Sequence, residues 1–127
     1  MSNLAPEVLL LSRLPEAHEE LLRALTTRGI PVAVVRDPTR VLSALRRTPV
    51  VVLVDLVHGA GLDRASVARL NRDRGQSLVV ALHQGAFGDA LGELANLSVD
   101  GYCRAGNWRP IAGLAGRFTP HASQLVH

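Results

Sequence analysis

The stretch Pro49–Gly61, PVVVLVDLVHGAG, decides the fold. Five apolar residues, Val50–Val54, follow one another without a polar break and lead into Asp55, after which a loop with glycines begins. A short apolar run that opens after a proline is typical of a strand buried on both faces, as the central strands of parallel sheets are. Asp55 is therefore predicted at the carboxyl edge of a sheet, where open α/β folds place their functional sites.

The composition is that of one globular domain. A chain of 127 residues can bury a core without disulfides, and hydrophobic and charged fractions of 47% and 20% are ordinary. No apolar run approaches the about 18 residues of a membrane span, no signal peptide is recognisable, and the lone Cys103 cannot form an internal disulfide. We expect a domain over residues 1–118, a loose tail over residues 119–127, and a cytoplasmic location without membrane contact.

The charge pattern argues against nucleic-acid binding. The net charge is +3, but the arginines alternate with acids, as in NRDRG at Asn71–Gly75. Aromatic residues, on which bases would stack, make up only 3% of the chain. All 14 basic residues are arginine, so any mechanism that needs a lysine is excluded.

Strand and helix patterns alternate five times along the chain. Apolar runs predict strands at Glu7–Ser12, Ile30–Val35, Val50–Val54, Ser77–Leu82 and Val99–Arg104. Helical spacing predicts helices at Pro15–Arg28, before Arg47, between Asp63 and Gly75, at Phe87–Leu97 and at Trp108–Phe118. Right-handed crossovers then favour a single-domain α/β fold: a doubly wound five-stranded parallel sheet of flavodoxin-like order 2-1-3-4-5, with helices on both faces. Pro31 places its strand at a sheet edge.

Three of these segments together resemble the receiver domain of two-component response regulators, the CheY-like superfamily. They are VLLLSRLPE (Val8–Glu16), VVLVDL (Val51–Leu56) and VDGYCRAG (Val99–Gly106). The resemblance extends from about Glu7 to Phe118. It implies the strand order given above, Asp55 as the equivalent of the phospho-acceptor, and Tyr102 as the equivalent of the aromatic switch residue.

The other reactive positions of receivers are degenerate in this chain. The paired acids that hold Mg²⁺ beside the central Asp are replaced by Ser12 and Arg13, of which the second would repel the cation. The Thr or Ser that ends the fourth strand aligns with Leu82 or His83, and the Lys after the fifth strand aligns with Ala105. Because phosphoryl transfer depends on positioning and charge neutralisation, the resemblance implies a pseudo-receiver with no enzymatic activity, no cofactor and no metal.

Three hypotheses account for the retained Asp55. It forms an ion pair with Arg13, whose permanent charge takes the place of the metal; it is an unpaired, solvated residue left from ancestry; or it is still phosphorylated. The first hypothesis is preferred.

The histidines offer no recognisable metal motif. His18, His58, His83, His121 and His127 are scattered over separate elements, with no His/Cys/Asp spacing that would bind zinc.

The remaining aromatic residues each have two interpretations. Tyr102 is either a switch residue or a half-buried strand tyrosine with its hydroxyl in water. Trp108 is either an anchor for a partner or packs against Phe118 or the tail.

We expect a signalling or localisation module that acts by protein contact. The predicted contact surface is the face of the fourth helix, fifth strand and fifth helix, with Phe87, Tyr102 and Trp108 on or near it, and it would also serve for a homodimer. The chain would be a stand-alone adaptor or the N-terminal domain of a longer protein.

Two alternatives remain open. One is a working single-domain response regulator that a histidine kinase phosphorylates at Asp55. The other is a small-molecule binder that uses the crevice near Ser12, Asp55 and His83.

Overall fold

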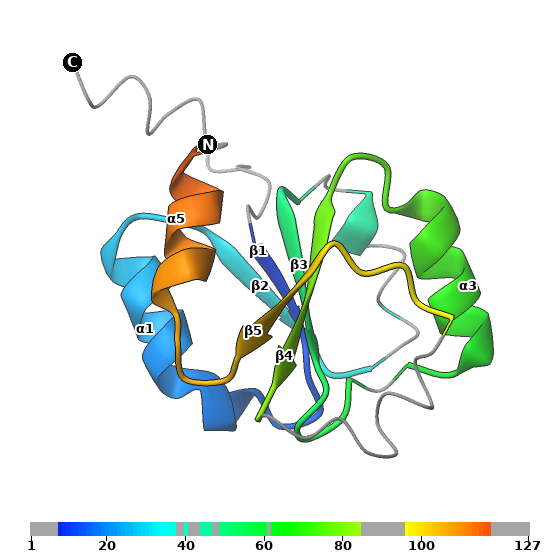
Figure 1. Cartoon of the computed structure of the whole chain (residues 1–127), viewed down its shortest axis with the longest axis horizontal. Coiled ribbons are helices and arrows are strands. Elements are labelled where there is room, and N and C mark those ends of the chain that lie inside the picture. Colours follow the sequence, from blue (N-terminus) through cyan, green and yellow to red (C-terminus); the bar gives the residue numbers. More distant parts are fainter. Residues whose placement is uncertain are drawn as a thin grey trace.

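The strands form one parallel sheet in the order β2-β1-β3-β4-β5 (Figure 1). The computed structural model describes residues 8–37, 40, 44–46, 49–60, 62–84 and 96–117. Within them the strands are β1 (Val8–Leu11), β2 (Val32–Val35), β3 (Val51–Asp55), β4 (Leu78–His83) and β5 (Gly101–Arg104). The predicted fold class and strand order are confirmed, and the strand after Pro31 lies at an edge, as predicted.

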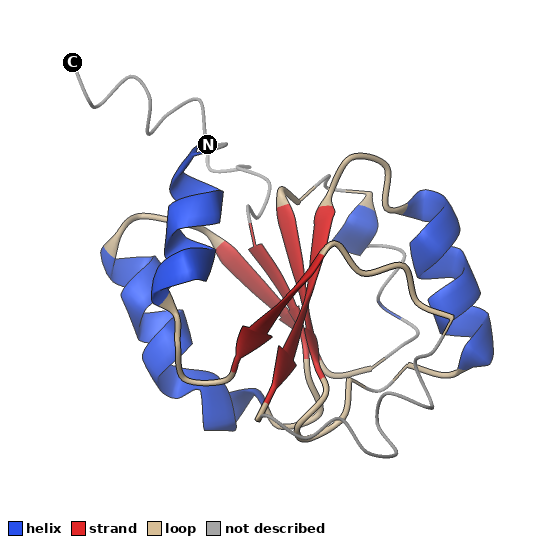
Figure 2. Ribbon diagram, viewed as in Figure 1, coloured by secondary structure: helices blue, strands red, loops and turns tan. Residues whose placement is uncertain are grey.

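Helices cover both faces of the sheet (Figure 2). One face carries α1 (Glu19–Thr27), which continues from the 3₁₀ turn η1 (Pro15–His18), together with α5 (Arg109–Arg117). The other face carries α3 (Arg64–Asp73). The predicted helix at Phe87–Leu97 lies almost entirely outside the described residues, and of the predicted short helix before Arg47 the structure describes residues 44–46, with Ala44 and Leu45 helical.

The central strands alternate between two hydrophobic cores. Residues Val51–Val54 of β3 are all fully buried. Val51 and Leu53 pack in the core under α1 and α5, whereas Val52 and Val54 pack in the core under α3. This alternation explains why β3 has no polar residue before Asp55, since successive strand side chains point to opposite, equally buried faces.

Local signals in the sequence set the helix ends. The carboxylate of Asp63 accepts a hydrogen bond of 2.7 Å from the N–H of Ser66 and caps α3, as predicted. Helix α1 ends before Gly29, whose φ of +74° is a left-handed conformation that favours glycine. No helix in the described part of the chain is long and apolar enough to cross a membrane.

The amino edge of the sheet holds an arginine–carboxylate pair. Arg74, just after α3, forms an ion pair with Asp100, which immediately precedes β5. The same carboxylate accepts a hydrogen bond of 2.8 Å from the N–H of Val79. A second guanidinium contact reaches the carbonyl of Ser77 at 3.2 Å. This pair therefore joins α3 to the starts of β4 and β5.

Candidate functional site

Asp55 is the centre of a polar cluster at the carboxyl edge of the sheet. It is the last residue of β3, and it is fully buried. Its Oδ1 accepts hydrogen bonds from the N–H of Val57 at 2.8 Å and the N–H of His58 at 3.1 Å. An aspartate that binds the backbone two and three residues ahead holds a tight turn, so the loop after β3 wraps around this carboxylate.

Ser12 supplies a hydroxyl to the other carboxylate oxygen. It directly follows β1, the neighbour of β3, and is fully buried. Its Oγ donates a hydrogen bond of 2.7 Å to Oδ2 of Asp55 and accepts one of 3.0 Å from the N–H of Leu14. The hydroxyl therefore links the loop after β1 to the end of β3.

Two histidines complete the contacts of Oδ2. His18, at the end of η1, is 5% exposed and places Nε2 at 2.8 Å from Oδ2. His58, in the loop after β3, places Nδ1 at 3.3 Å, and its side chain is 31% exposed. The two rings stand edge to face, with centroids 5.7 Å apart and an interplanar angle of 81°. Asp55 lies on the face of β3 that carries α1, and the turn opened by Pro15 brings His18 over it.

The cluster favours the ionised form of Asp55. Burial raises the pKa of its carboxyl group, but hydrogen bonds from His18, Ser12 and the backbone of His58 lower that pKa by more, and the net pKa lies well below the usual range. No side-chain nitrogen or oxygen buried in the described residues lacks a hydrogen-bond partner. Asp55 is therefore a carboxylate at neutral pH with all its nearest contacts supplied by the protein.

The predicted ion pair between Asp55 and Arg13 is wrong. The side chain of Arg13 is exposed, and its backbone N–H donates a hydrogen bond of 2.9 Å to the carbonyl of Gly59. A Cβ placed on Gly59, which has φ +93°, would lie 3.4 Å from Cδ of Arg13, so the stem of the arginine runs along this loop. Because neighbouring residues of an extended chain point to opposite sides, Ser12 takes the inward position and Arg13 the outward one. The solvated Asp55 of the second hypothesis is also wrong, since the residue is fully buried.

Although the sequence shows no His/Cys/Asp spacing typical of a metal site, the fold brings two of the scattered histidines to Asp55. One ligand atom from each of His18, Asp55 and His58 lies within 4.8 Å of the others, an arrangement that could hold a metal ion. The donors are two imidazoles and one carboxylate, which do not fit the all-oxygen octahedral shell of Mg²⁺. Sequence spacing missed His18 because it lies 37 residues from Asp55. The available signal was that both histidines closely follow strands whose carboxyl ends adjoin.

The end of β4 and the residue after β5 place neither a hydroxyl nor an amine at the predicted receiver positions. Leu82 of β4 pairs in register with Asp55, is 1% exposed and belongs to the core under α1 and α5. His83, the last residue of β4, is half-buried, and Ala105 donates its N–H to the carbonyl of His83 at 2.6 Å. The predicted degenerate positions thus lie around the carboxyl edge, and of their side chains that of Ser12 hydrogen-bonds to the carboxylate of Asp55.

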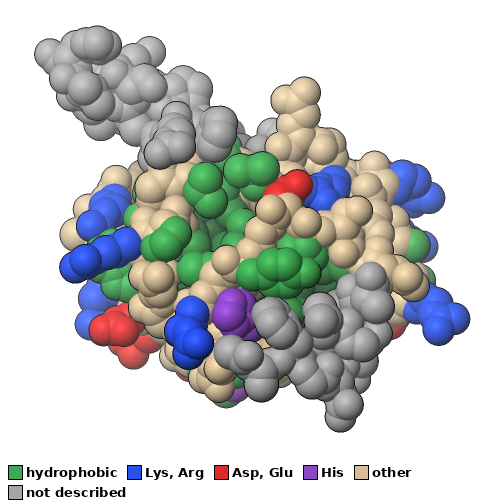
Figure 3. Space-filling view, viewed as in Figure 1, with side chains coloured by type: hydrophobic (Ala, Val, Ile, Leu, Met, Phe, Trp, Pro, Cys, Tyr) green, Lys and Arg blue, Asp and Glu red, His purple; other side chains and the backbone are tan. Residues whose placement is uncertain are grey.

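The aromatic residues lie at the β5 side of the molecule. Tyr102 is 55% exposed on the edge strand β5, and its ring stands 6.4 Å from that of His83. Trp108, just before α5, is half-buried against the core under α1 and α5, with the guanidinium of Arg28 4.4 Å from its ring centroid. Figure 3 shows hydrophobic side chains gathered on this side. Phe87, like Phe118 and the tail, lies outside the described residues.

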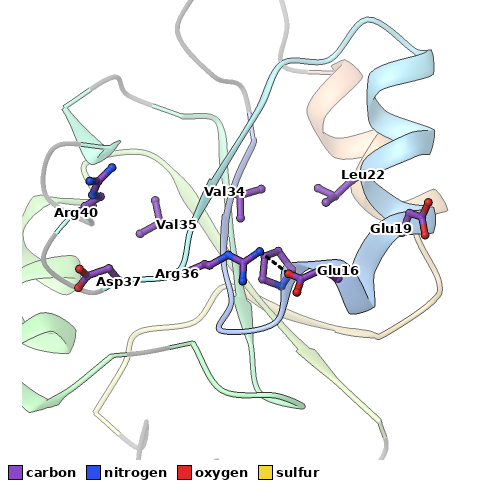
Figure 4. Close-up of a pocket in the computed structure, with 9 residues that line it drawn as sticks. Glu16, Glu19, Leu22, Val34, Val35, Arg36, Asp37 and Arg40 are labelled. Carbon is purple, nitrogen blue, oxygen red and sulfur yellow. Dashed lines mark hydrogen bonds and ion pairs between the residues drawn. The ribbon is translucent and has the colours of Figure 1, made fainter.

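A separate pocket lies between the start of α1 and the carboxyl end of β2 (Figure 4). It has a volume of about 770 Å³, and its walls include Glu19, Val34 and Asp37. An ion pair of 2.6 Å between Arg36 and Glu16 spans it. Ser12, Asp55 and His83 do not line this pocket, so it is not the crevice predicted for a small molecule.

No protein-family model and no curated protein matches the sequence. Solved structures do match. A response regulator from Burkholderia pseudomallei, with a phosphorylated aspartic acid, a calcium ion and citrate, is 20% identical with a TM-score of 0.65, over 94% of this chain and 69% of that one. The receiver domain of a sensor histidine kinase from Pseudomonas aeruginosa, with a magnesium ion coordinated in its active site cleft, is 21% identical with a TM-score of 0.68, over 90% and 97%.

A response regulator from Thermotoga maritima is 16% identical with a TM-score of 0.64, over 88% of this chain and 98% of that one. At these identities the likeness concerns the fold. The chain has the fold of the receiver domains of two-component response regulators.

Proposed function

We propose that the chain is a pseudo-receiver: a receiver-fold module of two-component or phosphorelay-type signalling that acts by protein contact, without enzymatic activity and without Mg²⁺-dependent phosphorylation of Asp55. The observation that carries this proposal is the state of the Asp55 carboxylate. Oδ2 is in contact with Ser12, His18 and His58, and Oδ1 accepts two backbone hydrogen bonds. An oxygen that attacks phosphorus must first give up such contacts.

The residues around Asp55 also lack the groups that assist phosphoryl transfer in receivers. Such transfer relies on metal ions and cationic groups that neutralise the oxygens of the phosphoryl group as it moves. Ser12 and the exposed Arg13 offer no carboxylate to a metal, and the chain has no lysine. Leu82, opposite Asp55, offers no hydroxyl. The pocket therefore lacks the groups that would lower the barrier to transfer.

Incubation with acetyl phosphate and Mg²⁺, followed by intact-mass measurement, tests this proposal. We expect no gain of a phosphoryl group. Asp55→Ala is the matched control, because it removes the residue that corresponds to the phospho-acceptor of receivers. A phosphoryl group gained by the wild-type protein and not by Asp55→Ala would favour the alternative, a working response regulator.

We propose further that protein contacts are made through β5 and the start of α5. Tyr102 on β5 is 55% exposed. Trp108, just before α5, is half-buried, and the guanidinium groups of Arg28 and Arg109 lie over its ring. Tyrosine, tryptophan and arginine are the side chains over-represented at energetic centres of interfaces. Sedimentation equilibrium of the wild type and of Tyr102→Ala tests the homodimer. We expect a concentration-dependent dimer that the substitution weakens by about tenfold or more, whereas Val34→Ala, at an exposed apolar residue on the opposite edge strand β2, leaves it unchanged.

A further inference from the structure

We infer that His18, His58 and Asp55 form a binding site for one divalent transition-metal ion of the zinc type. This inference concerns the same pocket as the proposed function but goes beyond it, since it assigns a ligand that the loss of phosphorylation does not require.

The three ligand atoms already converge. They are Nε2 of His18, Nδ1 of His58 and Oδ2 of Asp55, all within 4.8 Å of one another. Tetrahedral zinc, bonded at about 2.0–2.1 Å to nitrogen and oxygen, separates its ligand atoms by roughly 3.3 Å. The distance of 3.3 Å between Nδ1 of His58 and Oδ2 meets this value. Nε2 of His18 lies 2.8 Å from Oδ2, at hydrogen-bond distance. An ion would replace this hydrogen bond once the two atoms had moved apart by roughly half an ångström.

The kind of donor selects the kind of metal. Imidazole nitrogens suit zinc, cobalt, nickel and copper, whereas Mg²⁺ requires a shell of oxygens. Two histidines and one carboxylate also form a known type of zinc ligand set, with a fourth position left for water. The site should therefore exclude Mg²⁺ while accepting zinc.

The surroundings orient the ligands and leave a way in. The Ser12 hydroxyl at 2.7 Å and two backbone N–H groups hold the Asp55 carboxylate, as outer hydrogen bonds do in metal sites. His18 and Asp55 are buried, whereas the side chain of His58 is 31% exposed and marks the side from which an ion can enter. The three ligands come from η1, the end of β3 and the loop after it, so an ion would tie these segments together.

Titration of the full chain, first stripped with a chelator, tests the site. By isothermal titration calorimetry we expect one Zn²⁺ per chain and no saturable binding of Mg²⁺. Co²⁺ should give the intense visible absorption bands of a four-coordinate ion, and Zn²⁺ should raise the melting temperature, because a ligand that binds only the folded state stabilises it. Absence of saturable Zn²⁺ binding, or equal binding of Mg²⁺, would overturn the proposal.

Variants of histidine separate this site from adventitious binding. His58→Gln removes one ligand at a partly exposed position, and we expect the affinity for Zn²⁺ to fall about 100-fold or more with the fold intact. His83→Gln, a histidine at the end of the next strand and outside the cluster, is the matched control and should bind as the wild type does. Unchanged binding by His58→Gln would assign the ion to other histidines and overturn the proposal.

A conservative replacement adds a positive readout. Cysteine thiolate is a zinc ligand, so His58→Cys should restore most of the affinity lost in His58→Gln and add a sulfur-to-cobalt charge-transfer band to the Co²⁺ spectrum. A His58→Cys protein without this band would count against His58 as a ligand. These results are independent of the acetyl phosphate experiment, which contains no zinc, so failure of one proposal is distinguishable from failure of the other.

Discussion

The two aspartates at opposite edges of the sheet are stabilised by different means. At the amino edge, Asp100 is paired with Arg74, and its side chain is 42% exposed. At the carboxyl edge, Asp55 is fully buried and is held by Ser12 and two histidines. A guanidinium stays charged at any pH a protein tolerates, whereas imidazole loses its proton near neutrality and binds metals.

The comparison indicates which end of the fold depends more on individual side-chain contacts. The amino-edge pair joins α3 to the starts of β4 and β5 with a permanent charge, and water screens part of it. In the carboxyl-edge cluster, Asp55, Ser12 and His18 are buried, so its energy depends on each contact. The carboxyl edge is therefore the end whose stability should respond strongly to substitution and pH.

The largest expected effect is that of His18→Leu. The change removes the hydrogen bond of 2.8 Å between His18 and the buried carboxylate of Asp55, and taking a hydrogen-bond partner from a buried charged group costs about 3 kcal/mol or more. Urea denaturation at pH 7 should show this loss in the free energy of unfolding.

The double variant His18→Leu/Asp55→Leu sharpens that prediction. Because the double variant also removes the buried charge of Asp55, it should be more stable than His18→Leu alone. A double variant that is as unstable as the sum of its single changes would mean that the two residues do not act as a pair.

Acid should weaken the carboxyl edge next. The pKa of Asp55 is lowered by its hydrogen bonds with His18, Ser12 and the His58 backbone, which outweigh the rise caused by burial. A carboxyl group with a lower pKa in the folded than in the unfolded state contributes stability that is complete above about pH 5 and declines as the pH falls below about 4. This loss of stability should be smaller than that in His18→Leu. Acid neutralises the carboxylate, whereas His18→Leu leaves it charged with one hydrogen bond fewer.

Urea denaturation of the wild type and of Asp55→Asn from pH 7 to pH 3 measures this contribution. His18 and His58 face the same carboxylate, so the difference between the two proteins is the relevant quantity. We expect the difference to shrink as the pH falls; a difference that is constant or grows would contradict the lowered pKa.

A smaller effect is expected from two buried serines, one at each edge. Ser12→Ala removes a hydroxyl that donates to the Asp55 carboxylate, and a hydrogen bond to a charged group contributes about 2 kcal/mol. Ser77→Ala, at the amino edge, removes a hydroxyl that donates to the neutral carbonyl of Pro49, for which about 1 kcal/mol is expected. Equal losses in the free energy of unfolding for Ser12→Ala and Ser77→Ala would mean that the hydroxyl at the charged carboxyl edge contributes no more than the one at the amino edge.

The smallest expected effect at these sites is that of Arg74→Met. Since Asp100 is partly exposed, water can solvate its carboxylate once the guanidinium is gone, and a loss of about 1 kcal/mol is expected. The control is Arg23→Met, which breaks the largely exposed i,i+4 pair with Glu19 and should cost only about 0.3 kcal/mol. If Arg74→Met lowered the free energy of unfolding as much as His18→Leu does, the amino edge would be as well shielded from water as the carboxyl edge.

Much of the fold could be predicted because its signals are local. The unbroken run Val50–Val54 predicted a strand buried on both faces, and Pro31 predicted the edge position of β2. Asp63 and Gly29 predicted helix ends. Each of these features depends on residues close in the chain, so no knowledge of distant contacts was needed.

The site was predicted only in part because its partners meet through folding. The apolar run before Asp55 placed this residue at the carboxyl edge of the sheet, and the resemblance to receivers implied that Ser12 stands where the family has an acid. The preferred hypothesis took Arg13 as the partner, although Ser12 and Arg13 point to opposite sides of the chain. His18 was not connected to Asp55, because the turn that brings its ring within 2.8 Å of the carboxylate is set by packing of α1 on the sheet.

The sequence by itself determined the order of strands, the position of Asp55 at the carboxyl edge of the sheet and the absence of lysine from the whole chain. Hydrophobic periodicity and residue identity carry that information directly. Only the tertiary structure decided that Asp55 is held by two imidazoles and a hydroxyl, because side chains far apart in sequence become neighbours when parallel strands end at one edge. That assembly, which no spacing rule predicts, places two imidazole nitrogens and a carboxylate oxygen within 4.8 Å of one another.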